Sequence, residues 1–168
     1  SSLVIFLFLN ISGIRMFNSL NLSMSLISLG GFLPTNSLER IIKSNPQKLI
    51  LIFSLLISML NFFLILNIFQ KRIIIRDHKE DLYLVLMSFI FILLVYLSGY
   101  SGLDIVISVL SSLSNSGLSL MSSNNNLSLF FILITVVGGS LISNSSGIKF
   151  MRIYILLKTV FAEIIKVV

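Results

Sequence analysis

Uncharged apolar stretches alternate with short polar breaks along this chain. The segments 49–70 and 82–103 each run from end to end without a single charged residue. About 20 apolar residues cross the hydrocarbon core of a bilayer as one helix. Both segments are apolar on every side, which a core helix of a small soluble domain is not. The pattern therefore predicts spans at residues 49–69 and 82–97.

A longer uncharged stretch, 105–148, separates Asp104 from Lys149. It is too long for one span, and polar residues interrupt it at 114–117 and 122–126. The apolar residues 105–113 cover roughly 14 Å as a helix, about half of the bilayer core. Non-helical backbone at membrane depth survives only where protein or a water-filled cavity covers it. We therefore expect a short helix that enters the membrane and turns back, followed by backbone that lines a cavity.

The sequence contains this unit twice. Residues 12–32 align without a gap with residues 98–118. Asn18 stands opposite Asp104, so each short helix is expected to begin at an N-cap residue. Repeats inside a membrane chain are typical of transport proteins, and this one predicts a pore built from several re-entrant units. The identical pairs are Ser12/Ser98, Gly13/Gly99, Ser25/Ser111, Ser28/Ser114 and Gly31/Gly117.

The predicted fold is an all-α membrane protein made of repeated units, each with an outer helix, a pore helix, a filter loop and an inner helix. The first unit is residues 1–70, with its pore helix at about 18–28, its filter at 28–32 and its inner helix at 49–69. We expect it to be truncated at its N-terminus, because the chain opens inside an apolar run without Met. A cytoplasmic link, 71–81, leads to the second unit, residues 82–168. That unit has its outer helix at 82–97, pore helix at 104–114, filter at 114–118 and a broken inner helix at 127–168.

Composition and charge agree with a membrane protein. Charged residues make up 11 % of the chain and the mean hydropathy is +1.06, whereas soluble domains carry roughly 25 % charged residues. The net charge of +6 comes from Lys and Arg beside apolar spans, which orients helices and does not indicate nucleic-acid binding. The link 71–81 and the basic residues Lys149, Arg152, Lys158 and Lys166 then lie on the cytoplasmic side. We expect a multi-pass protein of the cytoplasmic membrane, surrounded by lipid.

Several other functions lack the residues they need. The chain has no cysteine and one histidine, so neither a thiolate metal site nor a catalytic cluster is expected. We predict that it is not an enzyme and has no cofactor. A proton-pumping respiratory subunit needs ionisable residues in mid-span, and residues 49–69 and 82–97 have none. The alternative that stays open is a polytopic subunit of another transport or respiratory complex, in which the repeats only pack.

Three segments resemble the TrkH/KtrB potassium transporters. Residues 138–152 are similar to the G-G-S-x-x-S-T-x-G-G-x-K-x-x-R segment of that family, and residues 27–32 to the S-T-G-G-F filter of its second repeat. Residues 104–118 resemble its third repeat. The resemblance covers nearly the whole chain but only two of the four repeats. It implies a potassium-channel-like fold, uptake of potassium or another monovalent cation, a homodimer and a cytosolic nucleotide-binding regulatory subunit.

The candidate site residues fall into two sets. A potassium filter replaces the hydration shell of the ion with backbone carbonyl oxygens, and glycine supplies the unusual dihedrals that this requires. The candidate filter residues are Ser28, Leu29, Gly30, Gly31, Phe32, Ser114, Asn115, Ser116, Gly117 and Leu118. The carbonyls near Gly31 and Gly117 are expected to hold potassium. The family resemblance further implies an intramembrane gating loop of Gly138, Gly139, Ser140, Ser143, Asn144, Gly147 and Lys149.

Departures from the family pattern leave alternatives open. Family filters are rich in Thr before the glycine, whereas this chain has Ser, Asn and Leu there, and Leu118 stands where an aromatic residue is usual. Selectivity for potassium over sodium therefore does not follow from the sequence. The filter glycines can also be read as turn or packing glycines. Gly138 and Gly139 can be read as a helix contact, and Lys149 as an anchor on the cytoplasmic side.

Overall fold

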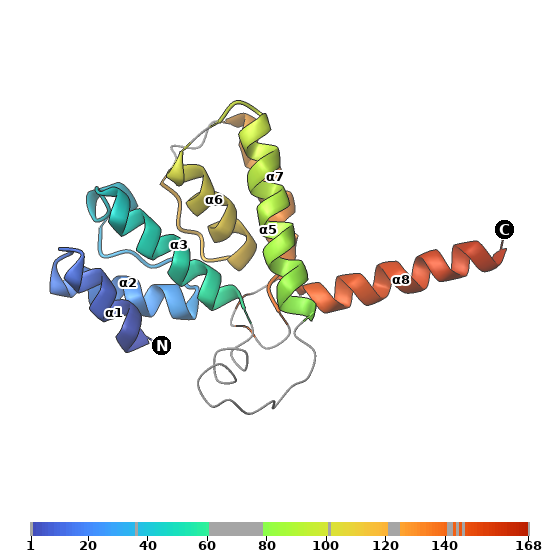
Figure 1. Ribbon diagram of the computed structural model, residues 1–168, viewed down its shortest axis with the longest axis horizontal. Coiled ribbons are helices and arrows are strands. Elements are labelled where there is room, and N and C mark those ends of the chain that lie inside the picture. Colours follow the sequence, from blue (N-terminus) through green and yellow to red (C-terminus); the bar gives the residue numbers. More distant parts are fainter. Residues whose placement is uncertain are drawn as a thin grey trace.

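The computed structural model describes residues 2–35, 37–60, 79–100, 102–120, 125–140, 143, 145 and 147–167. Its elements are α1 (Ser2–Ile11), α2 (Met16–Ser28), η1 (Leu38–Arg40), α3 (Asn45–Met59), α5 (Lys79–Leu97), α6 (Leu103–Ser114), α7 (Asn125–Val136), β1 (Val137–Gly138), β2 (Ile148–Lys149) and α8 (Phe150–Val167). The helices α1, α2, α3, α5, α6 and α7 form one bundle, and α8 extends away from it to the C-terminus (Figure 1). The chain is therefore mostly helical.

The two copies of the repeat share their backbone geometry. The turn after α1 contains Gly13 and the turn after α5 contains Gly99, both at φ +89°. The following helices, α2 and α6, end at the aligned residues Ser28 and Ser114. Helix α2 has 13 residues and α6 has 12 residues. At a rise of about 1.5 Å per residue, each helix covers roughly 20 Å or less, which is too short to cross the bilayer core.

The predicted N-caps of the short helices are wrong. Asn18 is the third residue of α2 and Asp104 is the second residue of α6, whereas Arg15 and Gly102 occupy the cap positions without a side-chain cap bond. Gly102 has φ +119°, which glycine adopts readily and other residues do not, so it turns the chain into α6 before Asp104 is reached. The Asp104 carboxylate instead pairs with Lys48 at 2.6 Å, which ties α6 to α3.

Helix α3 differs from the inner helix predicted at 49–69. It begins earlier because Ser44 and Gln47 form a capping box: the Gln47 amide oxygen accepts a bond of 3.2 Å from the Ser44 N–H. It ends at Met59, because Leu60 has an extended backbone with φ −78° and ψ 165°. The rest of the predicted span, 61–69, lies outside the described residues, as does most of the predicted link at 71–81.

In the second unit, the observed boundaries also differ in places. Helix α5 begins at Lys79, so the end of the predicted link is helical, and α7 begins two residues before the predicted inner helix. After α7 the chain forms β1, which pairs in parallel with β2, Val137 opposite Ile148 and Gly138 opposite Lys149. The all-α prediction does not include this pair of strands. Helix α8 follows directly at Phe150.

Two apolar clusters form the core, and α6 belongs to both. Its residues Ile107 and Leu110 pack in the first cluster with side chains of α1, α2 and α3. Its residues Ile105, Val109 and Leu113 pack in the second cluster with side chains of α5 and α7. Helix α6 therefore joins the two units of the repeat.

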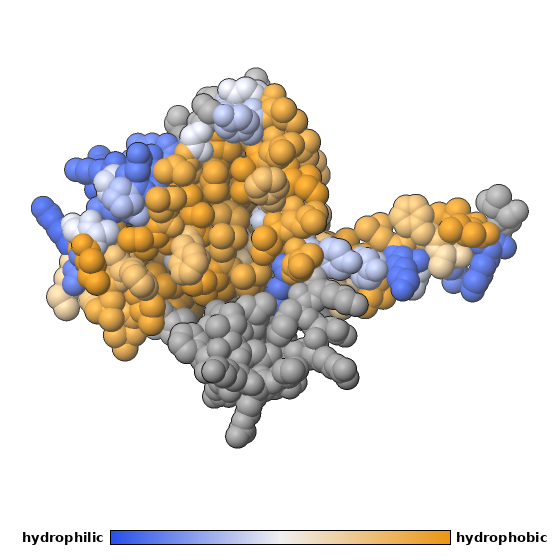
Figure 2. Space-filling view, viewed as in Figure 1, coloured by the Kyte–Doolittle hydropathy of each residue, from blue (hydrophilic) through white to orange (hydrophobic). Residues whose placement is uncertain are grey.

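The outside of the bundle is apolar as well. Apolar residues cover most of the face shown in Figure 2, and hydrophilic residues gather at one edge and along α8. Within the described residues, one helix is long and apolar enough to cross a membrane, Glu80–Leu97, and four shorter apolar helices accompany it. Large apolar side chains on α5 are exposed, such as Phe89 at 67 %. An exposed apolar surface of this kind is typical of a contact with membrane or with another protein.

Candidate functional site

The two predicted filter segments, 28–32 and 114–118, touch each other through their backbones. A Cβ added to Gly31 would overlap the carbonyl oxygen of Ser116 and would lie 3.8 Å from the Cα of Gly117. Only glycine therefore fits at position 31. Each predicted segment overlaps its helix by one residue, because Ser28 and Ser114 are the last residues of α2 and α6.

The backbone takes the same path in both segments. The residue after each helix, Leu29 or Asn115, is left-handed, with φ 52° and 58°. Two positions later, Gly31 and Gly117 have φ +67° and +70°. The left-handed conformation costs a residue such as leucine roughly 1–2 kcal/mol, and asparagine tolerates it better. The chain keeps this geometry in both copies although only one of the two capping residues suits it.

The ends of α2 and α6 carry matching hydrogen bonds. The Gly30 N–H donates to the Ser25 carbonyl at 3.2 Å, and the Ser116 N–H donates to the Ser111 carbonyl at 3.0 Å. These are the long-reaching bonds of Schellman motifs, which satisfy carbonyls that a helix end leaves open. Both helices therefore lead directly into the two segments, 28–32 and 114–118, that touch each other. A helix C-terminus carries partial negative charge, which favours a cation nearby.

Side chains distinguish the two copies. The Ser111 and Ser116 hydroxyls bond each other at 2.9 Å. In the first copy the aligned positions are Ser25 and Gly30, and the buried Ser25 hydroxyl has no hydrogen-bond partner among the described residues. Among the aligned side chains at the far end of the segments, Leu118 is fully buried and Phe32 is 79 % exposed.

The predicted gating loop lies against the second segment. A Cβ at Gly147 would lie 2.9 Å from the Asn115 side-chain nitrogen and 3.1 Å from the Thr135 carbonyl oxygen. The same Asn115 nitrogen donates to the Thr135 carbonyl at 3.0 Å. Gly147 also has φ +85°. Both the close contacts and the positive φ therefore exclude larger residues at position 147. The loop also contacts Asn115, the residue that caps α6.

The loop also contacts the end of α3. A Cβ at Gly139 would lie 2.8 Å from the Met59 carbonyl oxygen. That same carbonyl accepts a bond of 3.3 Å from the N–H of Ser140, which is fully buried. The first copy thereby supplies a backbone acceptor to the loop of the second. Nothing in the sequence pattern near Met59 could have revealed this contact.

Serine side chains and Lys149 hold the loop together. The Ser145 hydroxyl accepts a bond of 2.8 Å from the Gly139 N–H and lies 2.7 Å from the Ser143 hydroxyl. The half-buried Lys149 ammonium donates to the carbonyl of Ser143 at 3.0 Å and to that of Ser145. Arg152, further along in α8, is exposed. Of the remaining predicted loop residues, Gly138 lies in β1 opposite Lys149, and Asn144 lies outside the described residues.

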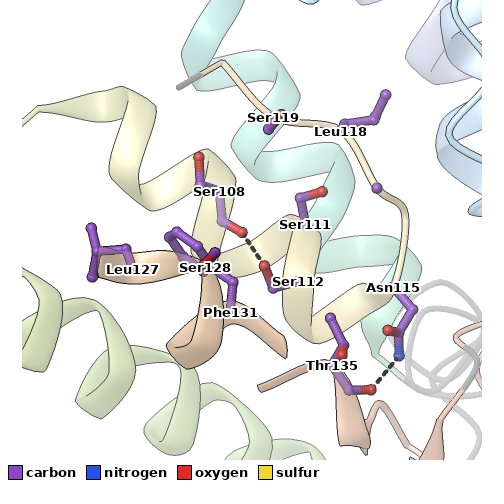
Figure 3. Close-up of a pocket in the computed structure, with 11 residues that line it drawn as sticks. Ser108, Ser111, Ser112, Asn115, Leu118, Ser119, Leu127, Ser128, Phe131 and Thr135 are labelled. Atoms are coloured by element: carbon purple, nitrogen blue, oxygen red, sulfur yellow. Dashed lines mark hydrogen bonds between the residues drawn. The ribbon is translucent and has the colours of Figure 1, made fainter. Parts of the chain in front are cut away.

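A cavity of about 270 Å³ opens behind the second segment, between α6 and α7 (Figure 3). The serines Ser108, Ser111 and Ser112 line its α6 side, and Phe131 and Thr135 line its α7 side. Ser108 and Ser112 are not among the residues predicted from the sequence, and Ser111 appears there only as an identical position of the repeat. Their spacing at i, i+3 and i+4, which places them on one helix face, was the available signal.

Comparisons with known proteins give one kind of match. No family model matches the sequence, and no curated protein matches it. The crystal structure of the potassium transporter TrkH from Vibrio parahaemolyticus matches the fold with a TM-score of 0.86 at 19 % sequence identity. The match covers 99 % of this chain and 39 % of that chain. The chain therefore has a TrkH-like fold, which confirms the family resemblance at the level of fold, and it spans well under half of the TrkH chain.

Proposed function

We propose that this chain forms two walls of a pore through which potassium, or another monovalent cation, crosses the cytoplasmic membrane. The observation that carries the proposal is the contact between the two equivalent segments at Gly31 and Ser116. Two backbone segments of the same shape, each at the end of a short helix, meet edge to edge. The TrkH-like fold supports the same function, because the protein with that fold is a potassium transporter.

The proposed filter works through backbone atoms. Carbonyl groups of residues 28–32 and 114–118 replace part of the hydration shell of the ion. The C-terminal ends of α2 and α6 add partial negative charge near the same place. In this proposal Ser28 and Ser114 connect the pore helices to the filter, and the following glycines allow the backbone to turn its carbonyls toward the ion path.

The proposed gate is the segment from Gly138 to Lys149. Helices α7 and α8 then form one inner helix that this segment breaks, which completes a second unit of residues 82–168 beside a first unit of residues 1–70. Glycine fits closely at 139 and 147, and Lys149 binds two loop carbonyls. In this proposal these contacts hold the segment closed. An ion that leaves the filter on this side would meet the segment, and opening would require the bonds of Lys149 to break.

The surroundings of the pore belong to the proposal as well. Lipid would cover the apolar outer surface of α5 and its neighbours. The resemblance to potassium transporters adds a homodimer and a cytosolic nucleotide-binding regulatory subunit. A change in that subunit would act on the gate through α8, which continues directly from the loop.

Potassium uptake in a host that lacks its own uptake systems tests the proposed function. We expect the protein to restore growth at low potassium and to take up potassium ions. A variant that lacks residues 141–146 should show higher flux, because the gate then has fewer groups to obstruct the path. Absence of uptake in a correctly inserted protein would instead favour a subunit whose repeats only pack.

A further inference from the structure

A polar pocket opens between the α1–α2 turn and the segment that leads into α3. It has a volume of about 360 Å³. Three basic side chains line it: Arg15 from the turn, and Arg40 and Lys43 from the segment. None of the described residues that line it is acidic, although Glu39 adjoins Arg40 in the sequence. Three positive charges around one pocket repel each other, so the pocket favours a negatively charged occupant.

Buried neighbours and one amide hold the two walls of this pocket in place. The Gln47 side-chain oxygen accepts a bond of 2.9 Å from the Lys43 N–H, and its nitrogen donates to the Ser12 carbonyl at 3.1 Å. Gln47 therefore ties the segment before α3 to the α1–α2 turn. Ile14 and Ile41, each next in sequence to one of the arginines, are 5 % and 6 % exposed and pack in the first apolar cluster. The backbone of the pocket is thus anchored to the core, whereas its three cations are exposed.

The two units of the repeat differ at this place. Asn18 in the first turn of α2 aligns with Asp104 in the first turn of α6. Asp104 provides a carboxylate that pairs with Lys48 at 2.6 Å, whereas Asn18, which lines the pocket, is uncharged. Among the described residues, no carboxylate forms an ion pair with the three cations of the pocket. The described part of the first unit therefore leaves these cations without a negative charge of its own.

Exposed apolar side chains border the pocket. Ile11 at the end of α1 is 81 % exposed, and Met16 and Phe17 at the start of α2 are 66 % and 71 % exposed. These residues flank the turn that contains Arg15. Figure 2 shows the hydrophilic edge of the molecule directly beside a broad apolar face. A ligand that fits both surfaces has an anionic group for the pocket and an apolar part for its border, which describes a phospholipid and not a free anion.

We propose that this pocket binds the phosphate group of an anionic phospholipid, with the acyl chains along the apolar surface of α1 and the start of α2. The planar guanidinium groups of Arg15 and Arg40 match phosphate oxygens in a two-bond arrangement, and the Lys43 ammonium adds a point charge. The α1–α2 turn is equivalent in the repeat to the α5–α6 turn, which follows the end of α5 opposite the predicted cytoplasmic link. The lipid therefore belongs to the outer leaflet. Lipid binding here requires the membrane location of the proposed function, but it does not require ion transport.

Lipid binding to the purified full-length protein tests the proposal. Increasing amounts of phosphatidylglycerol, or of zwitterionic phosphatidylcholine, are added to the protein in detergent, and bound lipid is counted by mass spectrometry of the intact complex. We expect phosphatidylglycerol to bind more tightly than phosphatidylcholine. The double variant Arg40→Gln/Lys43→Gln should weaken phosphatidylglycerol binding about fivefold for each charge removed, since each basic residue contributes about that factor at an anionic lipid surface. Equal affinities of the variant and the unmodified protein would overturn the proposal.

Two further variants separate the pocket from the net charge of the protein. The control Lys158→Gln/Lys166→Gln removes the same number of charges from exposed positions on α8. It should keep the affinity of the unmodified protein for phosphatidylglycerol. Lys43→Arg keeps the charge of the pocket, so it should also bind the lipid normally. If the α8 control lost as much affinity as the pocket variant, binding would follow net charge alone and the proposal would be wrong.

Two other occupants of the pocket give different results. If the pocket took a free anion, inorganic phosphate at millimolar concentration would stabilise the protein against thermal unfolding as well as phosphatidylglycerol does, which would refute the lipid assignment. If a carboxylate from another part of a longer polypeptide filled the pocket, Arg40→Gln/Lys43→Gln would be less stable without any lipid. Phosphatidylglycerol would then bind no better than phosphatidylcholine, and this result would also refute the assignment. Selective lipid binding by a protein that carries no ions would support the pocket and overturn the proposed function instead.

Discussion

Replacing Gly117 by alanine changes the proposed filter with little steric disturbance. A Cβ at this position meets no atom within 4 Å, so the substitution acts through the backbone alone. Gly117 has φ +70°, and a left-handed conformation costs a non-glycine residue roughly 1–2 kcal/mol. That free energy corresponds to a factor of about 5–30 in a conformational equilibrium.

Two responses are open to the Gly117→Ala variant. The backbone can keep its shape and store the strain, or it can relax to a negative φ and turn the carbonyls of residues 116 and 117 away from the ion path. Relaxation weakens the coordination of potassium, so we expect the preference for potassium over sodium to fall by up to about 5–30-fold. Uptake of the two ions, measured side by side in a host that lacks potassium uptake, reports this ratio.

Gly99→Ala is the matched control. Gly99 has φ +89° and its Cβ would also meet no atom within 4 Å, but it lies in the turn between α5 and α6, away from the proposed filter. Both variants should lose similar thermal stability in detergent, because both carry the same kind of backbone strain. Only Gly117→Ala should lose selectivity. If the two variants showed the same ion preference, Gly117 would be a turn glycine and the assignment of the filter would be wrong.

Other contacts lead to three further predictions. Gly31→Ala should destabilise the protein more than Gly117→Ala in a thermal unfolding measurement, because its Cβ would overlap a backbone carbonyl of the other segment. Lys149→Met should raise potassium flux, because it removes the donors to two loop carbonyls, whereas Lys158→Met on the exposed face of α8 should leave flux unchanged. Asp104→Asn should lower stability by at most about 1 kcal/mol, because its ion pair with Lys48 is partly exposed; a larger loss in chemical unfolding would contradict this.

The repeat carries most of what can be learned about this fold from the sequence. The identical pair Ser28 and Ser114 marks the last residues of α2 and α6, and the pair Gly13 and Gly99 marks two turns with the same φ. A local backbone motif such as a helix end depends on a few neighbouring residues, so aligned sequences adopt it in the same way. The function of these segments as a filter stays a prediction.

Long-range contacts account for what the sequence could not reveal. The strands β1 and β2 have two residues each, which is too short for a periodic pattern to appear in the sequence. They pair only because the loop between them folds back on itself. The contact at the end of α3 is also long-range, because Ser140 of the other unit donates its N–H to the Met59 carbonyl.

The position of Asn115 couples the proposed filter to the proposed gate. Its left-handed backbone ends α6, its side chain donates to the Thr135 carbonyl at the end of α7, and Gly147 of the loop packs against the same side chain. Any movement that carries the loop away from the proposed ion path must therefore change the packing around Asn115. Because this residue directly precedes Ser116, whose carbonyl touches Gly31, the disturbance reaches the contact between the two segments through the adjoining peptide bond. A gate in this place would alter the filter whenever it opens, so conduction and selectivity are expected to change together.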